Sequence, residues 1–116
     1  MKLTLPVPPS GNASYRTGRG HFYRSKAAQS YHDTVELLCK AQRVTMMRGP
    51  ITLEVKWYRA RRAGDLDGRL KVLQDALQGR AYANDSQIVK IIAERFEDKD
   101  NPRMQVTITD YEDTNG

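Results

Sequence analysis

The stretch ITLEVKWYRARRAGDLDGRLKVLQDAL, residues 51–77, decides the fold class. Its first eight residues alternate apolar and polar side chains, which predicts a strand with one buried face. The apolar members are Ile51, Leu53, Val55 and Trp57. A basic turn over residues 59–64 leads to a helix expected at about 67–78, with Leu70, Leu73 and Leu77 as its core face. Gly79 suits the position just after that helix.

On the N-terminal side, the sequence predicts a short strand, a long loop and a helix. Residues 2–5 alternate polar and apolar side chains, and the prolines that follow end the strand. Residues 10–24 hold three glycines and three arginines without an apolar period, which predicts a loop. Ser25 is the expected N-cap of a helix over about 26–43.

On the C-terminal side, two more strands follow. Residues 87–96 are apolar on both faces, so either both faces are covered or one faces a second subunit. Residues 104–108 alternate and form the last strand. The order β-α-β-α-β-β predicts an α/β fold of the mixed α+β type. We expect a small mixed sheet of about four strands with two packed helices, in a single domain of residues 1–116.

The charge is divided unevenly along the chain. Residues 1–64 carry a net charge of +9 and residues 65–116 a net charge of −4, within a total of +5. A basic half followed by an acidic half suggests a polyanion-binding surface beside an acidic site. The single cysteine, Cys39, excludes an intramolecular disulfide and suits a reducing compartment. No apolar run is long enough for a membrane span, so we expect a cytoplasmic protein without membrane contact.

The acidic residues after the basic turn are the candidate site. Asp65 and Asp67 stand at a strand-to-helix junction, where both carboxylates can enter one pocket; the alternative is that they cap the helix. Asp67, Lys71 and Asp75 are spaced to line one helix face, as a phosphate-binding group or as an exposed ion-pair ladder. Asn84 and Asp85 add oxygen atoms before the next strand, or simply form a turn.

Carboxylates in this number fit a hard cation. Asp65, Asp67 and Asp85 are expected to hold Mg²⁺, which would polarise a phosphate and activate a water. Lys71 would stabilise the developing charge. The arginines upstream would bind neighbouring phosphates without reading sequence. They are Arg59, Arg61 and Arg62.

The loop before the first helix mixes basic and aromatic residues. Its arginines are Arg16, Arg19 and Arg24, interleaved with Tyr15, Phe22 and Tyr23. This mixture either stacks on unpaired bases near a branch point or is ordinary loop packing. His21 could contact DNA, whereas His32 is expected on a solvated helix face. Cys39 is expected to be buried or half-buried on its helix.

The ordered set of motifs resembles the RusA family of Holliday junction resolvases. The matching motifs are Leu5-Pro6-Val7-Pro8-Pro9-Ser10 with Asn12, the basic run before Asp65-Leu66-Asp67, Lys71, Asp75-Ala76-Leu77, and Asn84-Asp85-Ser86-Gln87-Ile88-Val89. The resemblance implies a homodimer that binds four-way DNA junctions and resolves them by paired nicks. It implies Mg²⁺, with Mn²⁺ as a substitute, and no small-molecule cofactor.

Residue by residue, the resemblance implies that Asp65, Asp67 and Asp85 bind metal and that Lys71 assists catalysis. Asp75 and Asn84 are candidates for a supporting role. Two departures stand out: Gly68 replaces an asparagine, and Asn84 replaces an acid. Such genes often occur in phages and prophages, which implies a viral role in recombination or packaging.

Three functions stay open from the sequence. The first is a junction-resolving endonuclease, in which the aspartates are catalytic. The second is a DNA-binding module without catalysis, in which the aspartates are structural. The third is a metal-dependent nuclease that acts on flaps or single strands.

Overall fold

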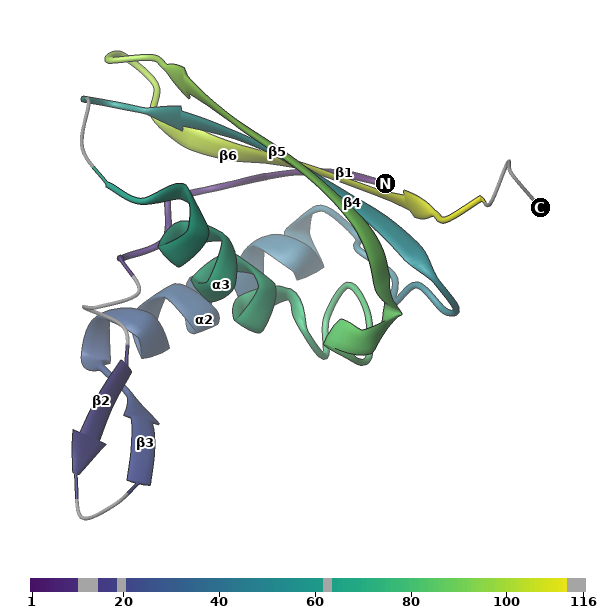
Figure 1. Ribbon diagram of the computed structural model, residues 1–116, viewed down its shortest axis with the longest axis horizontal. Helices are drawn as coiled ribbons and strands as arrows, with labels where there is room; N and C mark the ends of the chain where they lie inside the picture. The colour runs from purple at the N-terminus through teal and green to yellow at the C-terminus, as the bar shows by residue number, and fades with distance from the viewer. Residues whose placement is uncertain (11–14, 19–20, 62–63, 113–116) are drawn as a thin grey trace.

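The computed structural model describes residues 1–10, 15–18, 21–61 and 64–112, and of residues 15–18 and 21–23 it describes the backbone alone. The main elements alternate strand and helix, which confirms the mixed α/β class and the order β-α-β-α-β-β (Figure 1). They are β1 (Lys2–Leu5), α2 (Lys26–Ala41), β4 (Ile51–Arg59), α3 (Leu66–Leu77), β5 (Ile88–Glu97) and β6 (Arg103–Asp110). Two strands, β2 (Tyr15–Gly18) and β3 (His21–Arg24), and a 3₁₀ turn, η1 (Asp85–Gln87), complete the described elements.

The main sheet has four strands in the order β1-β6-β4-β5. β6 pairs antiparallel with both β1 and β4, whereas β5 pairs parallel with β4. A parallel pair needs a long crossover connection, and α3 provides it. Both helices cover the same face of the sheet and leave the other face open (Figure 1).

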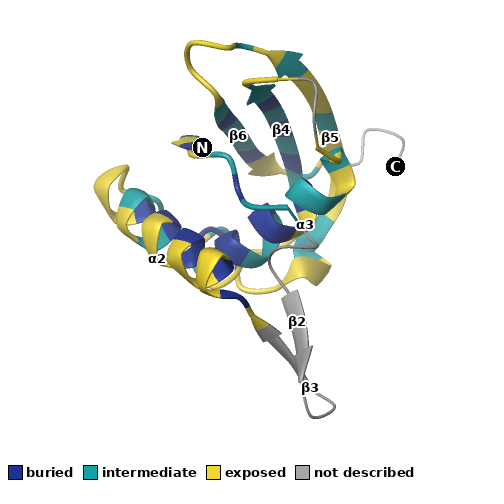
Figure 2. Cartoon of the chain, turned by 90° about the vertical axis from the view of Figure 1, so that its left-hand side faces the viewer, coloured by how far each residue is buried: buried dark blue, intermediate teal, exposed yellow. Residues whose placement is uncertain are grey.

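The core lies between the sheet and the two helices. The inner face of β4 is buried throughout, as its alternation predicts, with Ile51, Leu53 and Val55 fully buried and Trp57 only 2% exposed. Figure 2 shows the buried residues of α2 on the side that faces the sheet and α3. The Tyr31 hydroxyl donates to Pro6 O at 2.7 Å, which ties α2 to the segment that follows β1.

The helix ends follow local signals in the sequence. The Ser25 hydroxyl accepts from Ala28 N–H at 3.2 Å, which confirms the predicted N-cap of α2. α2 ends at Ala41, two residues before the predicted end, and Arg43 takes a φ of 56°. α3 ends at Leu77, and Gly79 has a φ of 85°, the left-handed conformation that glycine adopts freely.

The predicted loop at 10–24 is wrong in part, because β2 and β3 form an antiparallel hairpin within it. Tyr15 pairs with Arg24, and Gly18 pairs with His21. The segment has β-prone aromatic residues, but a two-stranded ribbon outside the core needs no apolar period, so the sequence pattern missed it. Figure 1 shows the hairpin projecting beyond α2, away from the main sheet.

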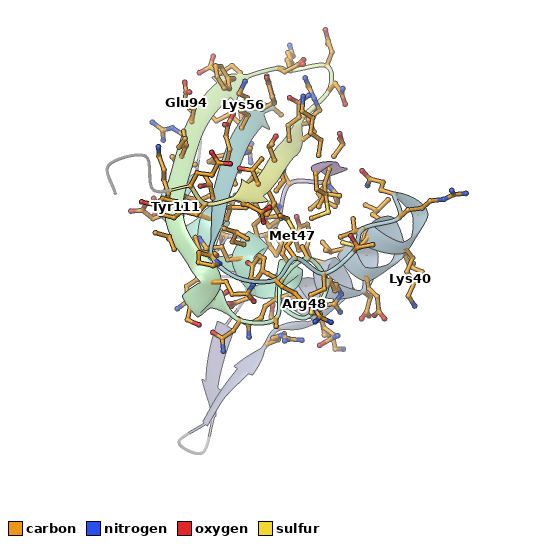
Figure 3. The ribbon with its side chains drawn as sticks, turned by 90° about the vertical axis from the view of Figure 1, so that its right-hand side faces the viewer. Lys40, Met47, Arg48, Lys56, Glu94 and Tyr111 are labelled. Atoms are coloured by element: carbon orange, nitrogen blue, oxygen red, sulfur yellow. The ribbon has the colours of Figure 1, made fainter. Side chains whose placement is uncertain are left out.

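β5 is an edge strand with apolar side chains on both of its faces. Ile91 is in register with Leu53 of the inner face, and Ile92 is in register with Glu54 of the open face. Val89, Ile91 and Ile92 are 52%, 45% and 38% exposed. Within one chain, therefore, neither face of β5 is fully covered. On the open face, Lys56 of β4 and Glu94 of β5 are register partners near one end of the sheet (Figure 3).

None of the described helices is long and apolar enough to span a membrane.

His32 is buried, which corrects the prediction of a solvated position. Its side chain is 1% exposed and lies in the buried face of α2, with Ala28, Val35 and Cys39. These residues recur at the helical period on both sides of His32. The buried face of α2 is therefore rotated toward His32 and Cys39, compared with the face that the apolar residues predict. The predicted burial of Cys39 is confirmed. Burial lowers the pKa of His32 to about 4, with smaller contributions from the charges of Arg24 and Arg80.

Because His32 is buried and its pKa is lowered, we expect the protein to lose stability as the pH falls from about 6.5 to about 4. Unfolded His32 takes up a proton near its ordinary pKa of 6.5, but folded His32 does so only near pH 4. The unfolded state therefore binds more protons between these values, and its stabilisation grows as the pH falls through that window. Urea denaturation of the wild type and of His32→Gln, measured from above pH 6.5 to about pH 4, is expected to give a smaller acid loss for the variant. Parallel curves for the two proteins would contradict the assignment.

Candidate active site

The turn after β4 carries the chain from the sheet to the first aspartate. Gly64 has a φ of 102°, and a Cβ on it would lie 2.9 Å from Trp57 Cη2, so only glycine fits there. Asp65 follows in an extended conformation and is the N-cap of α3. Its carboxylate accepts from Asp67 N–H at 3.1 Å, while the side chain stays exposed. Asp65 therefore caps the helix, whatever else it does.

One face of α3 is polar, as its spacing predicts. Asp67 and Lys71 are exposed and Asp75 is half-buried, whereas Leu70, Leu73 and Leu77 are buried on the face that meets the core. The acidic and apolar faces are therefore separate. A phosphate group could approach Lys71 and the carboxylates on either side of it from solvent.

Asp85 is presented by a short 3₁₀ turn that other side chains hold in place. Asn84 is its N-cap and accepts from Ser86 N–H at 2.9 Å, and the Gln87 amide oxygen accepts from Asn84 N–H at 3.0 Å. The Gln87 amide N–H donates to Met47 O and to Gly49 O, both at 3.0 Å, which fastens the turn to the loop before β4. The amide oxygen of Asn84 is thus used for capping, and Asp85 itself is exposed.

Asp75 and Asp85 share one region of negative potential. Burial raises the pKa of Asp75, and the charge of Asp85 raises it further. The pKa of the Tyr82 hydroxyl is also raised, first by burial and then by Asp85 and Asp75. Tyr82 is fully buried and donates to Gln74 O at 2.9 Å, so its ring supports this end of α3. Asp75 therefore lies close enough to Asp85 for the two charges to interact.

The predicted trio of Asp65, Asp67 and Asp85 is not gathered within one chain. Among the described residues, no three His, Cys, Asp or Glu side chains form a group that could hold a metal ion. The reason is the crossover itself: α3 starts where β4 ends and finishes where β5 begins (Figure 1). Its 12 residues span about 18 Å at about 1.5 Å per residue. The acidic residues form two halves, Asp65 with Asp67 at one end of α3 and Asp75 with Asp85 at the other.

The predicted DNA-binding arginines differ in their surroundings. Arg61 is exposed, and Arg24 is exposed with its guanidinium donating to Gln29 Oε1 at 3.3 Å. Arg59 is mostly covered, with 14% of its side chain exposed, and lies 3.5 Å from Glu97. Arg19 and Arg62 lie outside the described residues, as does the side chain of Arg16.

Arg69 is a functional candidate that the sequence reasoning missed. It follows Asp65 by one helical turn, and its backbone N–H donates to Asp65 O at 3.1 Å. Its side chain lies over the Trp57 ring, with 5.5 Å between Cζ and the ring centroid, and donates to Pro8 O. The i, i+4 spacing from Asp65 was a usable signal, but nothing local showed that this side chain turns toward the sheet.

A family model described as Endodeoxyribonuclease RusA matches residues 6–109. The chain belongs to the RusA family. Three relatives illustrate the similarity. The Crossover junction endodeoxyribonuclease rusA of Enterobacteria phage 82 is 31% identical over 111 residues, which cover 93% of this chain and 92% of the relative. The enzyme of the same name from Escherichia coli strain K12 has the same identity and coverage. That of E. coli O139:H28 strain E24377A is 33% identical over 91 residues, 75% of this chain and 74% of the relative.

The RusA match covers both acidic halves and every described element after β1, apart from the last residue of β6. The resemblance inferred from the motifs is thereby confirmed. The structure shows where the two residues that depart from the RusA pattern lie. Gly68 lies in the first turn of α3 and is half-buried, and Asn84 is the cap of η1.

The capping geometry predicts that the structural role of Asp65 can be separated from its charge. Asparagine caps helices as well as aspartate does, whereas alanine cannot cap. Asp65→Ala is therefore expected to lower the free energy of unfolding by about 0.5–2 kcal/mol, and Asp65→Asn to leave it nearly unchanged. Urea denaturation of the two variants measures the difference. Equal stability of the alanine and asparagine variants would show that the cap is not used.

Proposed function

We propose that this chain is a metal-dependent endonuclease that resolves four-way DNA junctions by paired nicks. The observation that carries the proposal is the exposed acidic face of α3, which begins directly after a basic turn, in a chain of the RusA family. Relatives over nearly the full length are named crossover junction endodeoxyribonucleases. Carboxylates beside arginines suit a phosphodiester substrate.

The donor atoms of the acidic face fit a hard divalent cation. They are carboxylate oxygens, which Mg²⁺ and Mn²⁺ prefer, and Asp65 and Asp67 at the start of α3 and Asp85 of η1 are exposed to solvent. The mutual repulsion of Asp75 and Asp85 marks a place where a cation would lower the electrostatic energy. Asp65, Asp67 and Asp85 would hold the ion, with Asp75 beside Asp85. When bound, Mg²⁺ polarises the scissile phosphate and makes a water nucleophilic.

The chain's own residues place and stabilise the DNA. The Lys71 ammonium, between the two acidic halves on the exposed face of α3, stabilises negative charge on the phosphate as the bond to the leaving oxygen lengthens. Arg61 and Arg24 bind flanking phosphates and supply affinity that depends on salt. The hairpin of β2 and β3, whose sequence includes Arg16 and Arg24, projects beyond the body of the protein (Figure 1).

A second copy of the chain would complete the site. Because Asp65 and Asp85 lie at opposite ends of α3, one ion cannot contact both within one chain. A two-fold dimer that pairs the β5 edges antiparallel sets the start of one β5 beside the end of the other. The end of β5 is in register with Arg59, just before the turn that leads to Asp65. Asp65 and Asp67 would then lie beside Asp85 of the partner subunit. The two-fold axis would give two such sites, which suits a near-symmetric junction.

The composition of β5 supports this dimer. Its outer edge leaves backbone groups open for pairing, and Val89, Ile91 and Ile92 leave apolar surface in solvent. A partner strand would satisfy the backbone groups and cover the side chains on both faces. Two sites related by two-fold symmetry suit paired nicks in opposite strands.

Cleavage of a synthetic junction tests the activity. The wild type, in Mg²⁺ or Mn²⁺, is expected to nick a labelled four-way junction in pairs and to spare a linear duplex of matched sequence, and EDTA is expected to stop the reaction. Asp67→Asn is expected to lower cleavage at least about 100-fold while it still binds the junction, because a ligand is lost but the arginines remain. Asp33→Asn, an exposed helical aspartate on α2, is the control and should cut normally.

The other outcomes separate the alternative functions. Tight junction binding without nicks in either metal would favour a binding module, an alternative that the dispersed carboxylates and the engaged amide of Asn84 keep open. Preferential cutting of a flap or a single strand would favour a nuclease for another branched structure. Normal cutting by Asp67→Asn would refute the site.

A mixing experiment tests whether the sites are shared between subunits. Asp67→Asn and Asp85→Asn should each be inactive alone. In a mixed dimer, one composite site carries both changes and the other carries neither, so the mixture is expected to regain nicking. The nicks should be unpaired, because only one site per dimer is intact.

Sedimentation of each variant at the assay concentration controls for dimer formation. If both variants are dimeric and exchange subunits when mixed, and the mixture stays as inactive as either one alone, each site lies within a single chain, and the composite arrangement is wrong.

A further inference from the structure

A small pocket beside the acidic face of α3 is lined by three arginines and a tryptophan. It has a volume of about 180 Å³, and its polar walls are Trp57, Arg59, Arg61 and Arg69. Arg59 and Arg69 approach the same indole ring, with Cζ at 6.0 Å and 5.5 Å from the ring centroid. Two guanidinium groups from different elements therefore converge on one ring.

Three N–H donors at this pocket lack acceptors. Within the described part of the chain, Trp57 Nε1, Arg59 Nε and Arg69 Nε are buried and make no hydrogen bond. Trp57 is 2% exposed, so water does not replace the missing acceptor readily. Buried donors are paired in the great majority of native proteins, and unpaired ones reduce stability. The hydrogen-bonding capacity of the residues that line this pocket is therefore not met by the described part of the chain.

The positive charge at the pocket is only partly balanced. Among the described residues, the carboxylate beside Arg59 is that of Glu97, which lies 3.5 Å away and is half exposed. Arg69 donates to the neutral carbonyl of Pro8 and has no carboxylate in contact among the described residues. The Arg69 side chain is half-buried, so its cation is held partly out of water, and an anion would offset that desolvation.

We propose that this pocket binds a phosphate group of the DNA, other than the one that is cut. Its volume of about 180 Å³ is below the roughly 300–1,000 Å³ of pockets that enclose a drug-sized ligand, so it takes a small anion and not a base with its sugar. Arginine presents several N–H donors in a planar fork, which matches phosphate oxygens. The identity of the ligand as DNA rests on the proposed function, whereas the phosphate chemistry does not.

The pocket is linked to the acidic face through the backbone. Arg69 N–H donates to Asp65 O at 3.1 Å, and a Cβ on Gly64 would lie 3.4 Å from Arg69 Nη2 and 2.9 Å from Trp57 Cη2. Gly64 thus allows the turn directly before Asp65 to lie against the Trp57 ring and the Arg69 guanidinium. A phosphate held by Arg69 would align the DNA strand with the aspartates one helical turn away.

Trp57 provides a direct readout, because it is the only tryptophan in the chain. Inorganic phosphate, titrated at constant ionic strength against chloride, is expected to change the fluorescence of the wild type saturably. Arg69→Met should abolish this change. Arg48→Met removes the same charge from an exposed loop at the opposite end of the sheet from Lys56, the neighbour of Trp57, and should leave the titration unchanged (Figure 3).

Arg69 also holds Pro8, so folding needs its own control. Arg69→Lys keeps a cation but loses the planar fork, and Arg59→Met removes the second arginine and keeps the contact between Arg69 and Pro8. Both should weaken the phosphate response, while circular dichroism confirms that they fold. In junction binding, Arg69→Met should reduce the salt dependence of log K by about one unit of slope, as the loss of one phosphate contact requires.

The outcomes separate this inference from the proposed function. The pocket alone would be overturned by three results together. The wild type would cut junctions, its Trp57 fluorescence would not respond to phosphate, and Arg69→Met would bind junctions with the same salt dependence as the wild type. A phosphate response that Arg69→Met abolishes, in a protein that cuts no DNA, would support the pocket and refute the nuclease. A response equal in Arg59→Met, Arg69→Lys and the wild type would also overturn the pocket.

Discussion

The parallel pairing of β4 with β5 is the constraint on which the rest of the structure depends. Parallel neighbours cannot be joined by a tight turn, so the chain must cross back along the sheet before β5 begins. α3 makes that crossing and is itself held by Leu73, Ala76 and Leu77, which are fully buried. Its polar face is left in solvent as a consequence. The acidic groups are therefore positioned by the hydrophobic core, which they do not enter.

The same constraint divides the acidic groups into two halves. Asp65 begins the crossover and Asp85 ends it, so the length of α3 keeps them apart within a chain. Each half is held by different residues. The close packing of Gly64 on Trp57 fixes the turn before Asp65. Hydrogen bonds of Tyr82 and Gln87 fix the end of α3 and the turn that carries Asp85. In the proposed enzyme these carboxylates would be the metal ligands, and a second copy of the chain would bring the two halves together. The uncovered apolar side chains of β5, at the edge of the sheet, would be covered in such a dimer.

Trp57 connects the fold with the basic side of the molecule. It closes the core at the end of β4 and also forms the surface on which Arg59 and Arg69 lie. Arg69 in turn holds Pro8, in the segment that leads toward the hairpin of β2 and β3. One aromatic side chain thus contributes both to stability and to the placement of positive charge. The N-terminal segment, the basic turn and α3 meet around it.

Residues close together in the chain were sufficient to predict the local structure and the chemistry that the chain can offer. The alternation in β4, the caps at Ser25 and Gly79, the separate faces of α3 and the RusA motifs all follow from residues close together in the chain, where short-range geometry and hydrophobic period are sufficient. Only the tertiary structure decided which long-range neighbours these residues meet. It placed His32 in the core, turned Arg69 toward Trp57, paired β2 with β3, and set Asp65 and Asp85 at opposite ends of a helix. The physical reason is that burial, the screening of charge and the distance between ligands depend on packing between distant segments, which no periodicity within one segment encodes.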